Sequence, residues 1–188
     1  GLGNDYVYVS LFDQQVDDAP ALARVISDRH RGVGSDGLIL LVPSDDPHAH
    51  VRMIMYNSDG SRAQMCGNGL RCLAKLAYER GLTPKHACGG EQHIVVATDA
   101  GRLETFLTVD AQDRVTSVRV DMGEPILEPA RIPVAIERAG SPYHTEDPQG
   151  TIVNAPLVVD GQALRFTAVS MGNPHAVFFV DNLDAVEL

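Results

Sequence analysis

The feature that most constrains this chain is a glycine-rich corner that opens directly into an amphipathic helix. The corner reads Gln64-Met-Cys-Gly-Asn-Gly-Leu-Arg71, and apolar side chains then recur at helical spacing up to Arg80. Gly81 stands where a helix C-cap belongs. The pattern predicts a helix over residues 68–80 with one apolar face, and its first turn lies at Cys66, Gly67 and Asn68.

Strand-like patterns fill most of the remaining sequence, and one further helix is expected over residues 20–30. The predicted strands are 6–12, 38–42, 51–56, 94–98, 103–109, 115–121, 152–159, 164–170 and 176–180. The proline-rich stretch 124–149 is expected to contain a domain junction and an exposed loop. We predict a first domain over residues 1–115 and a second domain, incomplete in this chain, over residues 116–188.

Charge and hydropathy exclude two classes of partner. The 188 residues carry 15 Lys and Arg against 25 Asp and Glu, a formal charge of −10, and no basic run could follow a phosphate backbone. No apolar stretch approaches the roughly 20 residues that a membrane-spanning helix needs, and no signal peptide opens the chain. We therefore expect a cytoplasmic protein with neither nucleic acid nor membrane as a partner.

The three cysteines, Cys66, Cys72 and Cys88, indicate reduced thiols rather than disulfides or a metal site. Three is an odd number and too few for a disulfide framework. Neither their spacing nor that of the histidines suits zinc, so no metal is expected. Cys72 is predicted to pack beside the core face of the helix, and Cys88 is taken as incidental.

Cys66 is the candidate for chemistry because of its place at the predicted helix start. The first helical N–H groups have no partners within the helix, and the helix dipole adds about half a positive charge there. Such a position stabilises a thiolate and also offers donors to a carboxylate. Spacing alone leaves an inert cysteine in a tight turn as an equal alternative.

Four asparagines at predicted turns could supply neutral amide groups to a zwitterionic ligand, although asparagine is also common in turns for purely structural reasons. They are Asn4, Asn57, Asn68 and Asn173. Gly3-Asn4 and Gly172-Asn173 each precede a predicted strand, which suggests a duplicated architecture. His175 follows closely and could influence a nearby thiol.

Five motifs together resemble the PLP-independent amino-acid racemases and epimerases, and within them the diaminopimelate epimerase family. They occur in the order and at the spacings of that family, and cover the chain nearly end to end: Gly1-Leu-Gly-Asn-Asp5, Arg31-Gly-Val-Gly-Ser-Asp36, Tyr56-Asn-Ser-Asp-Gly-Ser61, Met65-Cys-Gly-Asn-Gly69 with Arg71, and Met171-Gly-Asn-Pro-His175. The resemblance implies an α/β fold of two pseudo-symmetric domains, each with strands wrapped around a central helix.

The resemblance also implies roles for individual residues. Cys66 would be one catalytic acid/base, and His175 would tune the thiols. Substrate would be held by Asn4, Asn57, Gly67, Asn68 and Asn173. Some relatives carry glutamine where this chain has Gly37, so a side-chain contact at that point is in doubt. The implied enzyme is a cofactor-independent isomerase and a homodimer, which converts LL- to meso-diaminopimelate for lysine and cell-wall precursors.

Inversion of an α-carbon without a cofactor needs a base on one face and an acid on the other, so two thiols are expected. If the spacing from Asn4 to Cys66 repeats after Asn173, the second cysteine would lie near residue 235, beyond Leu188. We therefore expect a truncated chain that is inactive alone. Two alternatives stay open: a proline or hydroxyproline racemase, and a non-catalytic module that binds carboxylates.

Overall fold

The computed structural model describes residues 3–85, 90–132, 134, 150–183 and 186. The chain divides into two compact units, Gly1–Met122 and Gly123–Leu188. This division follows strand β7 (Val115–Asp121), whereas the division predicted at residue 115 falls at the first residue of that strand. Hydrogen bonding to its neighbour β6 keeps β7 in the first unit.

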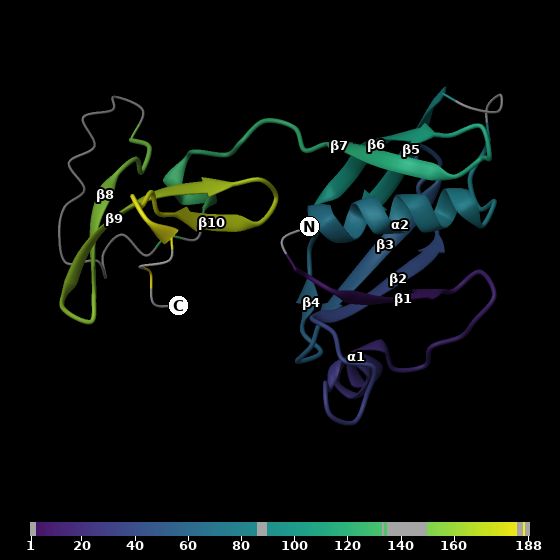
Figure 1. Ribbon diagram of the computed structural model, residues 1–188, viewed down its shortest axis with the longest axis horizontal. Coiled ribbons are helices and arrows are strands. Elements are labelled where there is room, and N and C mark those ends of the chain that lie inside the picture. The colour runs from purple at the N-terminus through teal and green to yellow at the C-terminus, as the bar shows by residue number, and fades with distance from the viewer. Residues whose placement is uncertain (1–2, 86–89, 133, 135–149, 184–185, 187–188) are drawn as a thin grey trace. The chain divides into compact units, whose positions relative to one another are not determined.

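A seven-stranded mixed sheet forms the first unit (Figure 1). Its order is β1-β2-β3-β5-β6-β7, and β4 pairs with β3 outside this path. β1 runs parallel to β2 and β3 parallel to β5, while the other neighbours are antiparallel. The bounds are β1 Tyr6–Ser10, β2 Gly37–Pro43, β3 Val51–Asn57, β4 Arg62–Ala63, β5 Gly90–Thr98 and β6 Gly101–Val109.

The sheet curls around helix α2 (Gly67–Glu79), which lies between β5–β7 on one side and β1–β3 on the other (Figure 1). The helix buries the apolar stripe expected from its sequence: Leu70, Leu73, Ala74, Ala77 and Tyr78 are fully buried in the main core. Gly81 adopts a φ of 68°, as a glycine after a helix C-terminus does. The predicted helix is therefore confirmed, with its bounds shifted by one residue.

Strand β2 is buried on both faces, which explains its unbroken apolar sequence. Ile39 and Leu41 point into the core around α2, whereas Leu38 and Leu40 belong to a second core. Helix α1 (Ala19–Ser27) packs over that second core. It ends three residues earlier than predicted because the Asp28 carboxylate accepts hydrogen bonds from the backbone N–H groups that follow it.

The second unit contains an antiparallel sheet of order β10-β9-β8 among its described residues. Its strands are β8 Ala155–Val159, β9 Gln162–Ser170 and β10 Pro174–Val177, and a short 3₁₀ turn, η1, covers Pro129–Arg131. Its core is small and consists of Ile132, Ile152, Ala155, Phe166 and Ala168. The strand predicted over 176–180 begins and ends earlier, and residues 178–180 are exposed.

Two further expectations from the sequence have different outcomes. The predicted loop within 124–149 lies largely outside the described residues. The two Gly-Asn corners do share a backbone feature, because Gly3 and Gly172 have φ values of 108° and 93° and each precedes a strand. No helix among the described residues is long and apolar enough to cross a membrane.

Candidate functional site

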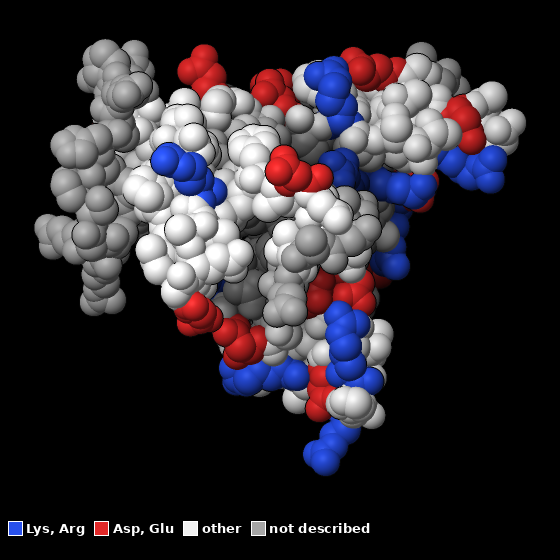
Figure 2. All heavy atoms as spheres, turned by 60° about the vertical axis from the view of Figure 1, so that its left-hand side comes forward, with Lys and Arg blue, Asp and Glu red and all other residues white. Residues whose placement is uncertain are grey.

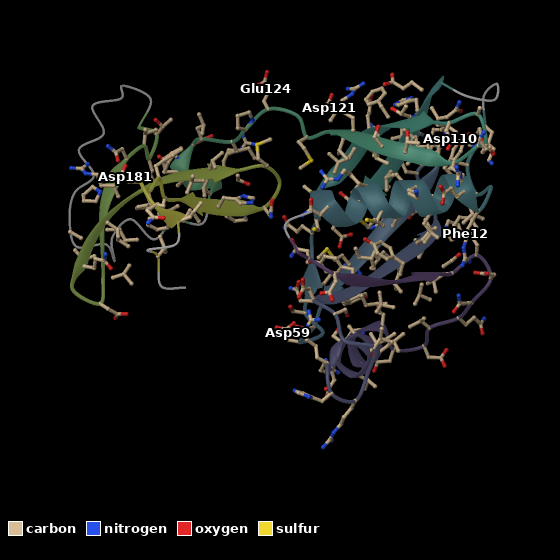
Figure 3. All side chains as sticks on the ribbon, viewed as in Figure 1. Phe12, Asp59, Asp110, Asp121, Glu124 and Asp181 are labelled. Atoms are coloured by element: carbon tan, nitrogen blue, oxygen red, sulfur yellow. The ribbon has the colours of Figure 1, made fainter. Side chains whose placement is uncertain are left out.

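One end of the first unit's sheet gathers the predicted site residues that belong to this unit. β1 and β2 are parallel and both begin there, and the antiparallel β3 finishes there, so Tyr6 pairs with Gly37 and Gly37 with Asn57. Figure 3 labels Asp59, in the turn that follows β3, at this end of the unit, and Phe12, just beyond β1, at the opposite end. Residues far apart in sequence therefore meet because of strand direction alone.

Cys66 is the N-cap of α2. Its backbone is extended, with φ −137° and ψ 115°, and its Sγ accepts a hydrogen bond from the Gly69 N–H at 3.5 Å. The Cys66 carbonyl accepts the first helical bond from Leu70 at 2.8 Å. Cys66 therefore lies at a helix N-terminus, where N–H groups without partners inside the helix and the positive end of the helix dipole attract negatively charged groups.

Tyr6 supplies a second donor to the same sulfur. Burial, followed by the charge of the adjacent Cys66 sulfur and its hydrogen bond with the phenol, raises the pKa of Tyr6 to about 12. A tyrosine with a raised pKa keeps its proton at neutral pH and so donates it. Cys66 is half-buried, and the Gly69 N–H and the Tyr6 phenol lie next to its sulfur.

Tyr8 lies two residues further along β1 on the same face and fixes the first turn of α2. Its hydroxyl donates to the Gly69 carbonyl at 3.2 Å. Burial, followed by the nearby Cys72 thiol, raises the pKa of Tyr8 well above its usual range. Sequence reasoning did not identify Tyr6 or Tyr8 as site residues, although strand alternation places both on one face.

Asn4 and Asn68 meet directly at the start of α2. The Asn68 side-chain N–H donates to Asn4 Oδ1 at 3.4 Å, and Arg71 donates to Asn68 Oδ1. On the other side, Asn4 Nδ2 donates to Asp36 Oδ2 at 3.4 Å. The structure thereby joins two of the predicted substrate-binding asparagines, 64 residues apart in sequence, in one hydrogen-bonded chain.

Asn57 belongs to the same end of the sheet but forms its own contacts. Its side-chain amide donates to Ser61 Oγ at 2.9 Å, which closes the turn after β3. Opposite it, a side chain at Gly37 would place its Cβ 2.1 Å from the Tyr56 carbonyl oxygen. Glycine at position 37 is therefore a requirement of the β2–β3 approach in this chain.

Asn173 and His175 lie in the second unit, at the beginning of β10. Both are exposed, and His175 Nδ1 is 2.9 Å from the Asn173 carbonyl oxygen. Their predicted roles, like those of Asn4, Asn57, Gly67 and Asn68, remain predictions.

The sequence predicts that Cys72 packs beside the core, and this prediction is wrong. Its side chain is exposed on α2. The buried face of α2 passes through Leu70, Leu73 and Ala77, and Cys72 falls between those rows. Cys88 lies outside the described residues. Within the part of the chain that the structure describes, no three His, Cys, Asp or Glu side chains form a group that could hold a metal ion.

Comparison with known proteins adds independent information. Residues 1–128 match the family model described as "Diaminopimelate epimerase". Curated relatives with that name include one from Agathobacter rectalis, 48% identical over 188 residues, and one from Desulfovibrio desulfuricans, 47% identical over the same length. Each alignment covers 100% of this chain and 61% of the relative. The chain thus spans about three-fifths of the length of these relatives.

Solved structures with low sequence identity share the fold. A probable proline racemase from Agrobacterium radiobacter superimposes with a TM-score of 0.61 at 17% identity, covering 85% of this chain and 39% of the other. A Bacillus anthracis protein of the PhzF family gives 0.55 at 19% identity, covering 97% and 52%. At these identities the likeness concerns the arrangement of strands and helices.

Proposed function

Because the chain belongs to the diaminopimelate epimerase family, we propose that the protein interconverts LL- and meso-diaminopimelate without a cofactor. The observation that carries this proposal is the Cys66 corner in a chain 48% identical to a relative of that name. Cys66 removes or returns the α-proton. Amide groups of Asn4, Asn57, Asn68 and Asn173 and the backbone of Gly67 hold the substrate, and His175 tunes the thiols.

The reaction as proposed uses one acid/base on each side of the α-carbon. A thiolate takes the proton from one face while a thiol delivers a proton to the other, and the two exchange roles in the reverse direction. The developing negative charge has no cofactor to spread into, so donors at the start of α2 must stabilise it through the substrate carboxylate. The position of Gly67 and Asn68 in the first turn of α2 supports assigning this role to them.

The second thiol is not expected on α2. Cys72 follows Cys66 on the same helix about 9 Å further along its axis, at 1.5 Å per residue, and therefore does not oppose it. We propose that the opposing thiol belongs to the part of the longer relatives that this chain does not match, that the complete protein is a cytoplasmic homodimer of lysine and cell-wall precursor synthesis, and that the 188 residues alone are inactive.

Exchange of the substrate α-proton in deuterated water tests the proposal. NMR should show deuterium entering LL- and meso-diaminopimelate with a full-length protein that contains this sequence, but not with the 188-residue chain. In the full-length protein, Cys66→Ser should lower turnover by several orders of magnitude, whereas Cys72→Ser, the matched control on the same helix, should leave it nearly unchanged. Appreciable epimerisation by the 188-residue chain would overturn the two-thiol proposal.

Two further experiments test the alternatives, a proline or hydroxyproline racemase and a non-catalytic carboxylate-binding module. Proline and trans-4-hydroxyproline, offered to the full-length protein, should show no α-proton exchange; exchange with either would favour a racemase of that class. Iodoacetamide should modify Cys66 rapidly, in a pH-dependent manner, and diaminopimelate should protect it. Slow modification without protection would favour a non-catalytic carboxylate-binding module.

A further inference from the structure

We propose that Asp36 and Arg71 are positioning residues, which fix the orientation of the Asn4 and Asn68 side-chain amides. Neither residue has a role in the function proposed above. Each stands at one end of a series of hydrogen bonds, here called the relay, that runs from Asp36 through Asn4 and Asn68 to Arg71. The inference rests on the proposed function only in taking those two amides as substrate contacts.

The two ends of the relay, Asp36 and Arg71, differ in hydrogen-bonding character. A carboxylate offers only acceptors, so Asn4 must turn its NH₂ group toward Asp36. A guanidinium offers only donors, so Asn68 must turn its oxygen toward Arg71. These two constraints leave the Asn4 oxygen facing the Asn68 NH₂ group, and that is the contact observed. If either amide turned over, two acceptors or two donors would face each other.

Asp36 is itself held firmly in place. Its Oδ2 also accepts the Asp5 backbone N–H at 3.1 Å, and its Oδ1 accepts from Arg29 at 3.0 Å. Arg29 also forms two hydrogen bonds with Asp5, which lower the pKa of that carboxyl. The backbone of Asp36 bonds to Asp5 and Ser58, so the loops before β1 and β2 and after β3 converge on this residue.

The fixed orientation has a chemical consequence for a ligand. A side-chain amide has two N–H donors and two acceptor lone pairs, and the relay uses one donor and one acceptor of each asparagine. Each amide thus keeps one donor and one acceptor in defined directions. A zwitterionic amino-acid head group, with a carboxylate to accept and an ammonium to donate, matches such a set. Asp36 and Arg71 would therefore select for that head group without touching it.

NMR of the side-chain amides in the 188-residue chain tests the relay without any ligand. Asp36→Asn should displace the Asn68 amide signals as well as those of Asn4, although Asn4 is the only one of the two asparagines that Asp36 contacts. Arg71→Met should displace both pairs from the other end. Asp36→Glu keeps a carboxylate at this end, so the Asn4 and Asn68 amide signals should lie closer to their positions in the unsubstituted chain than they do in Asp36→Asn. Asp28→Asn is the matched control, because its carboxylate accepts only backbone N–H groups in a neighbouring loop.

Protection of Cys66 from iodoacetamide by meso-diaminopimelate, in the full-length protein that contains this sequence, tests whether the fixed amide orientation matters for ligand binding. In Asp36→Asn and Arg71→Met the concentration for half protection should rise about tenfold, while the unprotected modification rate stays unchanged. If Asp36→Asn displaces only the Asn4 signals, the relay is refuted. If the relay is present but protection is unaltered, the positioning role is refuted. Absence of protection in the unsubstituted full-length protein would count against the proposed function, and the NMR experiment would still decide whether the relay exists.

Discussion

At the scale of single residues, the environment of Cys66 combines two donors that have different origins. The Gly69 N–H comes with the helix start and would accompany any N-cap side chain. The Tyr6 hydroxyl comes from β1 and depends on that one side chain. The contribution of the tyrosine can therefore be separated from that of the helix by substitution.

Tyr6→Phe should slow the modification of Cys66 by iodoacetamide at neutral pH about threefold, because a neutral donor to the thiolate is lost. Mass spectrometry of the peptide that contains Cys66 measures this rate separately from that of the exposed Cys72. Tyr8→Phe is the matched control, since its hydroxyl donates to the Gly69 carbonyl instead. An unchanged or faster rate in Tyr6→Phe would show that the phenol does not stabilise the thiolate.

Residue-level features were predictable only where they depend on neighbours in sequence. The spacing of the Gly-rich corner and the following leucines predicted the helix and the place of Cys66 at its start. Contacts between distant elements were not predictable in this way. Asp36 reaches Asn4 because β1 and β2 are parallel neighbours that start together. Tyr6 lies near Cys66 because its side chain packs against the core around α2. Cys72 was misplaced because it is next to the buried Leu73 in sequence but about 100° away from it around the helix.

At the scale of elements, the close approach of β2 and β3 depends on Gly37. Gly37→Ala would place a Cβ 2.1 Å from the Tyr56 carbonyl oxygen, which is backbone and cannot turn aside. We expect a loss of about 2 kcal/mol or more in the free energy of unfolding, measured by urea titration. Gly67→Ala is the control, because its nearest neighbour is the Met122 sulfur at 3.5 Å. Equal stability of the two variants would contradict this account.

A second element-level feature is the joining of β3, β4 and the β5–β6 turn by Asp99. Its carboxylate accepts hydrogen bonds from Arg62 of β4 and from Arg52 of β3, the latter at 3.1 Å. The hydrogen bond from Arg62 is the largest cause that lowers the pKa of Asp99, and burial opposes it. Figure 2 shows acidic and basic side chains interspersed on the visible side of the molecule.

A lowered pKa makes the contribution of Asp99 depend on pH in a defined direction. The stabilisation is present above the ordinary carboxyl pKa near 4 and is lost as the pH falls through the lowered value. Asp99→Asn should reduce stability at pH 7 by roughly 0.5 to 1 kcal/mol and flatten its decline below pH 4. Asp45→Asn, at an 84% exposed carboxylate that also pairs with Arg52, should do neither. Parallel pH curves for the unsubstituted chain and Asp99→Asn would refute the assignment.

At the scale of the whole molecule, the two units differ in how much apolar surface they bury. Among the described residues, five form the core of the second unit, against fifteen in the core around α2. Nine of the twelve exposed large apolar side chains of the described residues belong to the second unit, and Phe179 is 88% exposed. A three-stranded sheet with so little burial should open at a lower free energy than the first unit.

Hydrogen exchange followed by NMR should therefore show amides of β8–β10 exchanging at least 100-fold faster than those of β2 and β3, a difference of about 2.7 kcal/mol. Phe166→Leu, in the small core, should accelerate exchange in β8–β10 alone. Phe179→Ser should leave exchange in every strand unchanged, because that ring is not part of the core. Equal protection of both sheets, or acceleration in both by Phe166→Leu, would mean that the two units unfold as one cooperative body despite their unequal cores.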